Sequence, residues 1–331
     1  MPEAHWRVRL AKAWYSGARW PRLLRPLAVL FRLAVGLRRV LYRRGVLRSR
    51  SFATPVVIVG NITVGGTGKT PVVIALAQSL ATRGLRAGIV SRGYGALAGE
   101  FPRIVSKDSR VEDVGDEALL MFQRTGCPCI VDPDRPRAVA ALLQANDVDV
   151  VLSDDGLQHY ALGRSMEIVL YDADRGFGNG LLLPAGPLRE PLSRLAEADF
   201  VLPRGHCAGG DGIAIHIGAA CNLRSGETRD VTQLPGYPEL AVVTGIAHPE
   251  SFINSLDALG VRARARIFPD HHLFVAEDFA GLETTDILMT EKDAVKCRSL
   301  AGQRAWSVPI DAQLPENLVD AVAELAVAAP R

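Results

Sequence analysis

The chain has 331 residues, of which 48% are apolar, 22% charged and 6% aromatic, a composition that excludes a disordered, collagen-like or coiled-coil protein. The net charge of +2 conceals an asymmetry: residues 1–50 hold 13 basic side chains and one acidic one, whereas the other 281 residues hold 25 basic and 35 acidic groups, a net charge of −10. The length predicts about two domains, and five cysteines without a CxxC pair or zinc-like spacing indicate a reducing compartment.

The first fifty residues predict a basic amphipathic helix. Arg32 interrupts the apolar run between Leu27 and Leu37, so the run is too short to span a bilayer, and the segment lacks the features of a secretory signal. At helical spacing, Arg25, Arg32, Arg39 and Arg43 lie opposite Leu27, Leu30, Ala34, Leu37 and Leu41. This pattern favours binding of residues 1–47 to an anionic membrane surface. A helix packed on the acidic body and a nucleic-acid-binding arm are the alternatives.

Short β-branched runs then alternate with helical patterns. Strands are predicted at 55–59, 86–91, 129–131, 148–153, 166–171, 240–244, 263–268, 287–290 and 306–309, and helices at 71–83, 116–125, 135–145, 249–259 and 315–328. Residues 204–237 are Gly-rich and irregular, which predicts a linker with short strands. The alternation predicts an α/β fold with a largely parallel sheet and a ligand crevice at the carboxyl ends of its strands.

The segment Gly60–Thr70 connects the first strand of this series to a helix and predicts a nucleotide-phosphate loop. Its phosphate-binding part is Gly65, Gly66, Thr67, Gly68, Lys69 and Thr70. Glycines let backbone N–H groups converge on phosphates, the lysine reaches the β and γ oxygens, and the threonine hydroxyl binds Mg²⁺. Thr63 stands where the common motif has its first glycine.

Two carboxylates, Asp154 and Asp155, follow the apolar strand at 148–153. Carboxylates at a strand end beside a phosphate loop are placed to bind Mg²⁺, directly or through water. Phosphoryl transfer to an alcohol also needs a group that accepts the hydroxyl proton. Spacing alone leaves several candidates for that role: Asp116, Asp172, Asp270, His159 and the pair His271 and His272.

Eight blocks of the sequence together resemble the tetraacyldisaccharide 4′-kinase family of lipid A biosynthesis. They occur in family order over almost the whole chain, at residues 60–71, 91–94, 114–117, 154–159, 175–180, 183–191, 270–272 and 290–296. The resemblance implies transfer of the γ-phosphate of ATP, with Mg²⁺, to the 4′-hydroxyl of an acylated glucosamine disaccharide 1-phosphate. It implies a peripheral enzyme at the cytoplasmic face of the inner membrane, and we expect a monomer that binds no nucleic acid.

The resemblance also implies roles for individual residues. Lys69 and Thr70 serve the nucleotide and metal, Asp154 and Asp155 the metal. Asp116 accepts the hydroxyl proton and is supported by a histidine of the second domain, for which we favour His271. Arg92, Arg135 and Arg189 are expected to contact phosphate, because the planar guanidinium binds phosphate oxygens in pairs.

The predicted organisation is a membrane-associating segment over 1–50, a P-loop-type kinase domain over 51–203, a linker over 204–237 and a smaller α/β domain over 238–331. Two other functions remain as alternatives. A ParA-like ATPase or GTPase switch has a similar loop but carries an extra lysine where this chain has Val64. A peripheral membrane protein that binds nucleotide without catalysis leaves Asp116 and the histidine pair unexplained.

Overall fold

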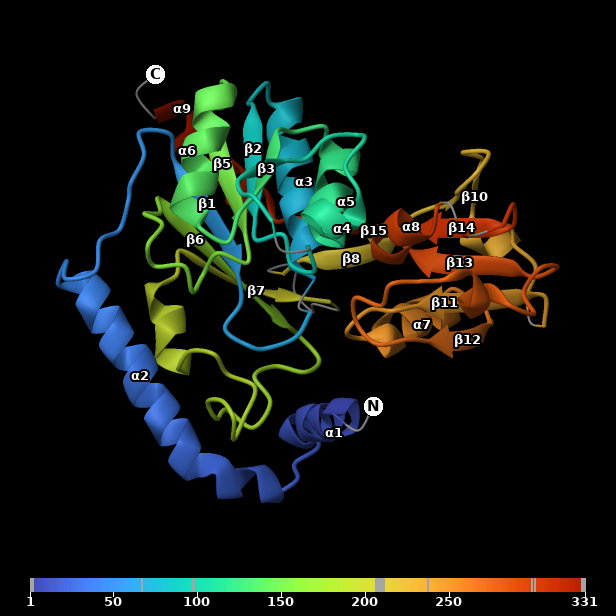
Figure 1. Ribbon diagram of the computed structural model, residues 1–331, viewed down its shortest axis with the longest axis horizontal. Helices are drawn as coiled ribbons and strands as arrows, with labels where there is room; N and C mark the ends of the chain where they lie inside the picture. The colour runs from blue at the N-terminus through green and yellow to red at the C-terminus, as the bar shows by residue number, and fades with distance from the viewer. Residues whose placement is uncertain are drawn as a thin grey trace.

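The computed structural model describes residues 3–66, 68–96, 99–205, 212–236, 238–298, 300 and 302–328. Within them, two α/β units stand side by side (Figure 1). The first is built on a seven-stranded sheet in the order β3-β4-β2-β5-β1-β6-β7, parallel except where β3 pairs with β4. Its strands are β1 (Val56–Gly60), β2 (Ala87–Ser91), β3 (Arg103–Ile104), β4 (Cys129–Val131), β5 (Val150–Asp154), β6 (Met166–Asp172) and β7 (Phe200–Arg204). The predicted α/β fold with a mainly parallel sheet is confirmed.

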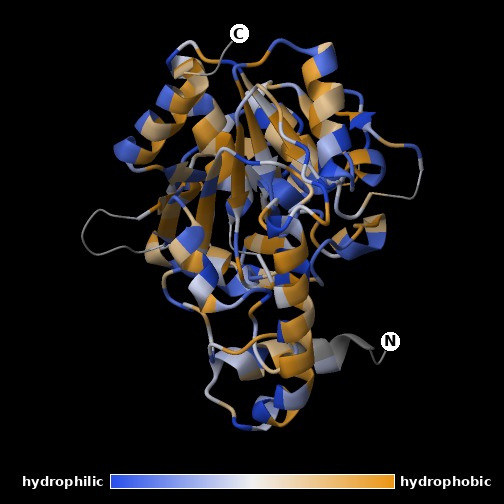
Figure 2. Ribbon diagram, turned by 90° about the vertical axis from the view of Figure 1, so that its left-hand side faces the viewer, coloured by the Kyte–Doolittle hydropathy of each residue, from blue (hydrophilic) through white to orange (hydrophobic). Residues whose placement is uncertain are grey.

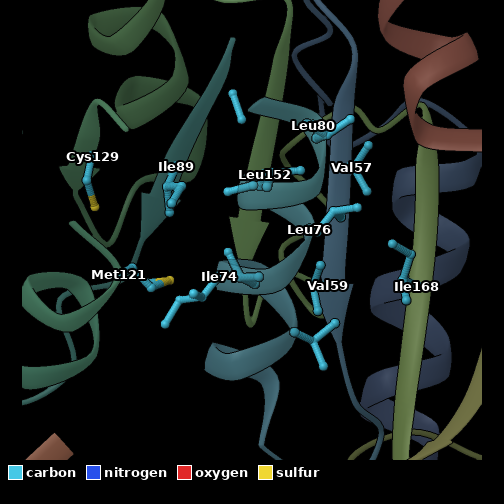
Figure 3. Close-up of a cluster of buried hydrophobic side chains, with 14 of the residues drawn as sticks. Val57, Val59, Ile74, Leu76, Leu80, Ile89, Met121, Cys129, Leu152 and Ile168 are labelled. Atoms are coloured by element: carbon cyan, nitrogen blue, oxygen red, sulfur yellow. The ribbon is translucent and has the colours of Figure 1, made fainter. Parts of the chain in front are cut away.

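Helices cover both faces of this sheet because its strands are apolar on both sides. One face packs against α3 (Lys69–Thr82), α5 (Asp116–Thr125) and α9 (Glu316–Ala328), and the other against α6 (Arg135–Ala145). Val57 and Val59 of β1 join the core that contains α3, whereas Val56 and Ile58 join the opposite core. Figure 3 shows the α3 side, where Leu76 and neighbouring apolar side chains gather over the strands. A single turn, α4 (Val111–Val114), precedes α5.

The second unit has a six-stranded sheet in the order β10-β9-β14-β13-β11-β12. Its strands are β9 (Ala220–Asn222), β10 (Thr228–Arg229), β11 (Leu240–Thr244), β12 (Arg264–Ile267), β13 (Asp286–Thr290) and β14 (Ala305–Val308). The last four pair in parallel, and β9 and β10 are antiparallel additions at one edge. Helices α7 (Pro249–Ala258) and α8 (Glu291–Cys297) pack on opposite faces.

The chain crosses between the units through a two-stranded ribbon. Strand β8 (Ala214–Ile217) pairs antiparallel with β15 (Ile310–Gln313), and α9 follows β15 back to the first unit. There Leu318 and Val322 enter the core beside α3. The structure therefore differs from the predicted division, which included this helix in a domain over 238–331. The predicted linker over 204–237 contains β8 and also β9 and β10, which belong to the second sheet.

The N-terminal segment forms two helices, α1 (Glu3–Tyr15) and α2 (Arg25–Arg43), below the first sheet in Figure 1. Trp14 of α1 is buried, and its indole donates to the carbonyl oxygen of Pro184 at 3.2 Å. Ala28 of α2 is buried in the α6-side core. Arg39 and Arg43, which were predicted to lie on the basic face, contact Glu197 at 2.6 Å each.

The opposite side of α2 exposes a row of apolar residues, visible along the long lower helix of Figure 2. The row, which we call the α2 apolar stripe, consists of Leu27, Leu30, Leu33, Leu37 and Val40 of α2 together with Leu23 of the 3₁₀ helix that precedes it. In the described part of the chain, no helix combines the length and hydropathy needed to cross a bilayer. Four short 3₁₀ helices complete the described elements, at Trp20–Leu24, Leu192–Glu197, Val231–Gln233 and Ala276–Phe279.

Candidate active site

The loop between β1 and α3 lies at the carboxyl end of the first sheet. Gly68 is the N-cap of α3 and has φ 67°, a left-handed conformation that glycine adopts without a steric cost. A Cβ atom added there would lie 2.8 Å from the Arg204 side chain. The loop therefore needs glycine at this position for its backbone conformation and for the close approach of Arg204. Thr67 lies outside the described residues.

A second chain segment braces the start of this loop. The backbone N–H of Val64 donates to the Pro187 carbonyl at 2.8 Å, and Thr63 forms an isolated antiparallel bridge with Leu188. Arg189 donates from Nε to the Thr63 carbonyl at 3.0 Å. The block at 183–191 thus supports the phosphate loop.

Lys69 and Arg189 converge on Asp155, which follows β5. Lys69 Nζ lies 3.5 Å from Asp155 Oδ1, and Arg189 Nη2 lies 3.1 Å from the same oxygen. Lys69 Nζ also donates to Asn61 Oδ1 at 3.3 Å. Burial raises the pKa of Asp155, but the charges of Lys69 and Arg189 outweigh burial and hold that pKa well below its usual range. Asp155 is therefore ionised at neutral pH.

Asp154, the last residue of β5, has the opposite electrostatic environment. Its side chain is buried, and burial together with the negative charge of Glu117 raises its pKa to about 7. Its Oδ1 atom is buried without a hydrogen-bond partner in the described structure. An unpartnered buried oxygen is costly, so this atom is suited to a ligand that supplies positive charge.

Asp116 and His271 come from different units and contact each other. Asp116 begins α5 and is 3% exposed, and His271 lies in the loop after β12. Their Oδ2 and Nδ1 atoms are 3.1 Å apart. Gly115 permits this placement: it has φ 85°, and a Cβ atom there would lie 2.6 Å from the carbonyl oxygen of Tyr94.

Basic side chains of α8 complete this cluster. Lys292 Nζ lies 3.0 Å from Glu117 Oε1 and 3.4 Å from His271 Nε2, and Lys296 Nζ lies 3.8 Å from Asp116 Oδ2. Burial raises the pKa of Asp116, but the His271 hydrogen bond and the two lysines outweigh it, so the pKa is lowered. Asp116 is thus a carboxylate at neutral pH.

The phosphate loop also faces the second unit. A Cβ atom added at Gly65 would lie 3.4 Å from His248 Nε2, and one at Gly66 would lie 3.3 Å from Ala247 Cβ. His248 in turn contacts Arg175 at 2.6 Å. Both units therefore contribute to the surroundings of the loop.

The other predicted residues fall into two groups. Arg92 is exposed after β2, at the same sheet edge as Asp155. Arg135 is only 1% exposed and donates to the backbone carbonyls of Asp154 at 2.7 Å and Asp132 at 3.4 Å. Part of the guanidinium thus holds the ends of β4 and β5, whereas its buried Nε has no hydrogen-bond partner in the described structure, and the phosphate contact of Arg135 stays a prediction.

Among the alternative proton acceptors, the structure joins only His271 to Asp116 within its described residues. His272 contacts Asp278 at 2.8 Å and stacks on Phe268. Asp172 contacts Arg204 at 3.2 Å. Burial and neighbouring arginines lower the pKa of His159 to about 4, so its ring is neutral at neutral pH.

Sequence reasoning assigned no role to Asn61, Arg204, Lys292 or Lys296. Lys292 and Lys296 belong to the block at 290–296, and their i, i+4 spacing places them on one side of a helix. That block was a signal, but α8 has only seven residues and was not predicted as a helix.

Known proteins are similar to this chain over most of its length. A sequence profile described as tetraacyldisaccharide-1-P 4′-kinase matches residues 20–326. The tetraacyldisaccharide 4′-kinase of Pseudomonas putida strain F1 is 46% identical over 308 residues, 92% of each chain. That of Nitrosococcus oceani is 47% identical over 311 residues, 93% of this chain and 91% of the relative.

A solved structure is similar as well. The crystal structure of LpxK from Aquifex aeolicus, described as a complex with ATP, has a TM-score of 0.75 and 27% sequence identity. The match covers 93% of this chain and 99% of that one. On the profile match and the identity to curated relatives over almost its whole length, the chain belongs to the tetraacyldisaccharide-1-P 4′-kinase family.

Proposed function

We propose that this protein transfers the γ-phosphate of ATP to the 4′-hydroxyl of a tetraacyldisaccharide 1-phosphate in lipid A biosynthesis. Family membership and the names of the relatives support this activity. The single observation that carries the assignment of the site is the contact between Asp116 and His271 across the two units. We place this pair in one site with the acidic end of β5, because the negative charge of Glu117, next to Asp116, contributes to the raised pKa of Asp154.

The nucleotide phosphates bind the loop that precedes α3. Backbone N–H groups around Gly65, Gly66, Thr67 and Gly68 and the N-terminus of α3 provide positive potential for phosphate oxygens. Lys69, held by Asn61 and Asp155 in this structure, turns to the β and γ oxygens. The crystal structure of the Aquifex relative, described as a complex with ATP, supports ATP as the nucleotide.

The residues at the end of β5 fit Mg²⁺. The unpartnered Asp154 Oδ1 and the ionised Asp155 offer oxygen ligands, and Thr70 offers a hydroxyl at the start of α3. Mg²⁺ keeps several waters and uses few protein ligands beside substrate phosphates, so a larger cluster of protein ligands is not required. When bound, the ion neutralises charge on the phosphate oxygens.

Asp116 accepts the proton of the acceptor hydroxyl. Its lowered pKa makes it a weak base, which suffices because the transition state of phosphoryl transfer is loose and the proton leaves late. His271 orients the carboxylate from the other unit, so the base is complete only when the units are together. Closing around both substrates then excludes water and limits ATP hydrolysis. Arg189 and Arg92 contact phosphate oxygens.

The N-terminal segment places the enzyme at its lipid substrate. Acyl chains remain in the bilayer, and the exposed α2 apolar stripe, flanked by arginines, suits the interface of an anionic leaflet. We therefore place the protein peripherally at the cytoplasmic face of the inner membrane, as a monomer. Functionally, residues 51–203 form the P-loop kinase domain and residues 1–50 its membrane segment.

One assay tests the function against its two rivals. The protein is incubated with γ-labelled ATP, Mg²⁺ and acylated disaccharide 1-phosphate in detergent, and lipid and free phosphate are separated. Labelled lipid is the expected product. Free phosphate alone would identify a nucleotide-hydrolysing switch, and neither product would identify a non-catalytic binder. The Lys69→Ala variant, which lacks the cation for the β and γ oxygens, is the negative control.

A further inference from the structure

Helix α8 contacts α5 through a series of ion pairs that joins the two units. Glu291 lies 2.6 Å from Arg124, Lys292 lies 3.0 Å from Glu117, and Lys296 lies 3.8 Å from Asp116. Of the three α8 side chains in this series, only Lys292 also reaches the imidazole of His271 within the described structure. This places an ammonium group on the far side of the ring from Asp116.

We propose that Lys292 is a positioning residue that selects the Nδ1–H tautomer of His271 and thereby holds the Asp116 carboxylate as an acceptor for the substrate proton. The inference rests on the proposed role of Asp116 as the base. Lys292 itself does not touch the reacting atoms. It acts through the ring of His271.

The chemistry of the two side chains sets the tautomer. An ammonium group has three N–H donors and no lone pair, so His271 Nε2, 3.4 Å from Lys292 Nζ, has to be the acceptor. In a neutral imidazole the proton is then on Nδ1. Nδ1 lies 3.1 Å from Asp116 Oδ2 and donates to it. The other Asp116 oxygen, Oδ1, accepts from the backbone N–H of Glu117 at 2.9 Å, so the carboxylate is held from two sides.

Lys292 remains charged in this environment. Burial lowers its pKa, but the carboxylates of Glu117, Asp116 and Asp270 outweigh burial, and the net pKa is raised. The group is therefore a permanent donor at any pH at which the enzyme operates.

Asp270 and Lys292 have opposite effects on His271 Nε2, because a carboxylate favours a proton on that nitrogen and an ammonium group does not. The Asp270 Oδ2 atom lies 3.7 Å from His271 Nε2 and would favour a proton on that nitrogen. Without the ammonium group, Nε2 can carry the proton and donate to Asp270, and Nδ1 then presents a lone pair to Asp116. This change removes the hydrogen bond that holds the carboxylate. The ionisable groups around the ring are Asp116 and Glu117 of α5, Lys292 and Lys296 of α8, Asp270 of its own loop and Tyr94, whose ring centroid is 4.7 Å away.

The backbone of His271 is held by contacts that do not involve Lys292. His271 has φ 59°, and its N–H donates to the Gly245 carbonyl at 3.1 Å. We therefore expect a change at Lys292 to leave the backbone position of His271 unchanged.

The experiment compares Lys292→Met, which removes donor and charge, with Lys292→Arg, which keeps both, in the full-length protein in detergent. ¹⁵N NMR of the imidazole nitrogens reports the tautomer without any substrate, and the His271 signals are identified by their loss in His271→Gln. We expect the Nδ1–H tautomer in the unmodified protein and in Lys292→Arg, and its loss in Lys292→Met.

Kinetics provide the second readout. We expect Lys292→Met to lower kcat by about 10²-fold, with the KM for ATP unchanged. Lys292 lowers the pKa of Asp116, so its removal raises that pKa and moves the acidic limb of the kcat/KM profile to higher pH. Glu291→Gln is the matched control, because it breaks an ion pair between the same two helices without touching the ring. We expect the acidic limb of the kcat/KM profile of Glu291→Gln to lie at the same pH as that of the unmodified protein.

Three outcomes would overturn the inference: an Nδ1–H tautomer that persists in Lys292→Met, an unchanged acidic limb in that variant, or an equal shift in Glu291→Gln. If Lys292→Met does not fold, Lys292→Gln removes the charge and has to show the same shift of the limb. If the unmodified protein phosphorylates no lipid while the NMR result is as expected, the proposed function fails and the tautomer assignment stands.

Discussion

Asp155 and His271 have backbone angles that residues with a side chain seldom adopt. Their φ values are 49° and 59°, and among the described residues they are the two non-glycine positions with positive φ. Such conformations cost of order 1–3 kcal/mol each and persist where the surroundings enforce them. Here the enforcement is polar: Lys69 and Arg189 hold Asp155, and Asp116 and Lys292 hold His271. Both residues lie in the proposed site.

Replacement of Asp116, the proposed base, should lower the activity without unfolding the protein. We expect Asp116→Ala to lower kcat by about 10²–10⁴-fold, because the hydroxyl proton then has no positioned acceptor. Labelled-lipid formation measures the loss, and circular dichroism checks the fold. Asp113→Ala, at an exposed position three residues earlier, is the control and should keep its activity. Near-normal turnover in Asp116→Ala would exclude this residue from proton transfer.

In the absence of Mg²⁺, ionised Asp154 should lower the free energy of unfolding. Burial raises its pKa to about 7, so the folded protein retains a proton that the unfolded chain releases above about pH 4. Its contribution to the free energy of unfolding therefore becomes increasingly unfavourable as the pH rises from about 4 to about 7. We expect Asp154→Asn, measured without Mg²⁺, to have a higher Tm than the unmodified protein at pH 8 and to lose this advantage at pH 4.5. A lower Tm at pH 8 would contradict the expectation.

At the residue scale, the sequence indicated which side chains belong to the candidate site better than it indicated which residues they contact. Lys69, Asp154 and Asp155 could be predicted because glycines, a lysine and strand-end carboxylates form a local pattern. Asp116 and His271 could be paired only through the family resemblance, since 155 positions separate them. Arg135 shows the opposite limit: its guanidinium chemistry suits phosphate, but the residue is buried and two of its N–H groups donate to the backbone carbonyls of Asp154 and Asp132.

At the scale of elements, helix α2 serves two environments at once. Its inner side buries Ala28 and contacts Glu197 through Arg39, whereas its outer side exposes the α2 apolar stripe. A helix that only covered the body would bury its leucines, so their exposure favours an external apolar partner.

The stripe can be tested without removing the helix. Leu30 and Leu37 are 63% and 60% exposed, so Leu30→Glu with Leu37→Glu should leave the fold intact. We expect this double variant to remain in the supernatant when sedimented with anionic lipid vesicles that pull down the unmodified protein, because charged side chains do not enter the acyl boundary. Leu259→Glu, at a 46% exposed position on the second unit, is the control. Continued co-sedimentation of the double variant would refute the membrane role of the stripe.

The interface between the units is also built at the element scale. Arg124 of α5 contacts Glu291 of α8 at 2.6 Å and Asp311 of β15 at 2.6 Å, so one side chain connects the first unit both to the second unit and to the ribbon between them. Helix α9 then anchors the chain in the first core. The described chain therefore leaves and re-enters the first unit through the ribbon of β8 and β15.

At the scale of the whole molecule, charge is separated along the chain. Thirteen basic groups in residues 1–50 precede a remainder with a net charge of −10. Such a molecule should orient on an anionic surface with its N-terminal helices toward the lipid and its acidic body away from it.

This orientation predicts a salt effect. We expect binding to anionic vesicles to weaken steeply between about 0.05 M and about 0.5 M salt, because the Debye length falls from more than 10 Å to a few ångströms. Binding to uncharged phosphatidylcholine vesicles, which depends on the α2 apolar stripe alone, should be weaker and nearly independent of salt. Titration of vesicles of both compositions measures the difference. Equal salt dependence for the two would contradict the electrostatic contribution.

The sequence by itself determined the α/β class and most strand and helix positions, and it predicted the phosphate loop and the acidic strand end. These features depend on the spacing of apolar residues, on the positions of glycines and on neighbours within a few residues, all of which can be read from the sequence. Only the tertiary structure decided that α9 returns to the first core, that His271 rather than His272 contacts Asp116, and that α8 adds Lys292 to that pair. These contacts join residues far apart in the chain, where burial and charge compensation, not local propensity, select the partner.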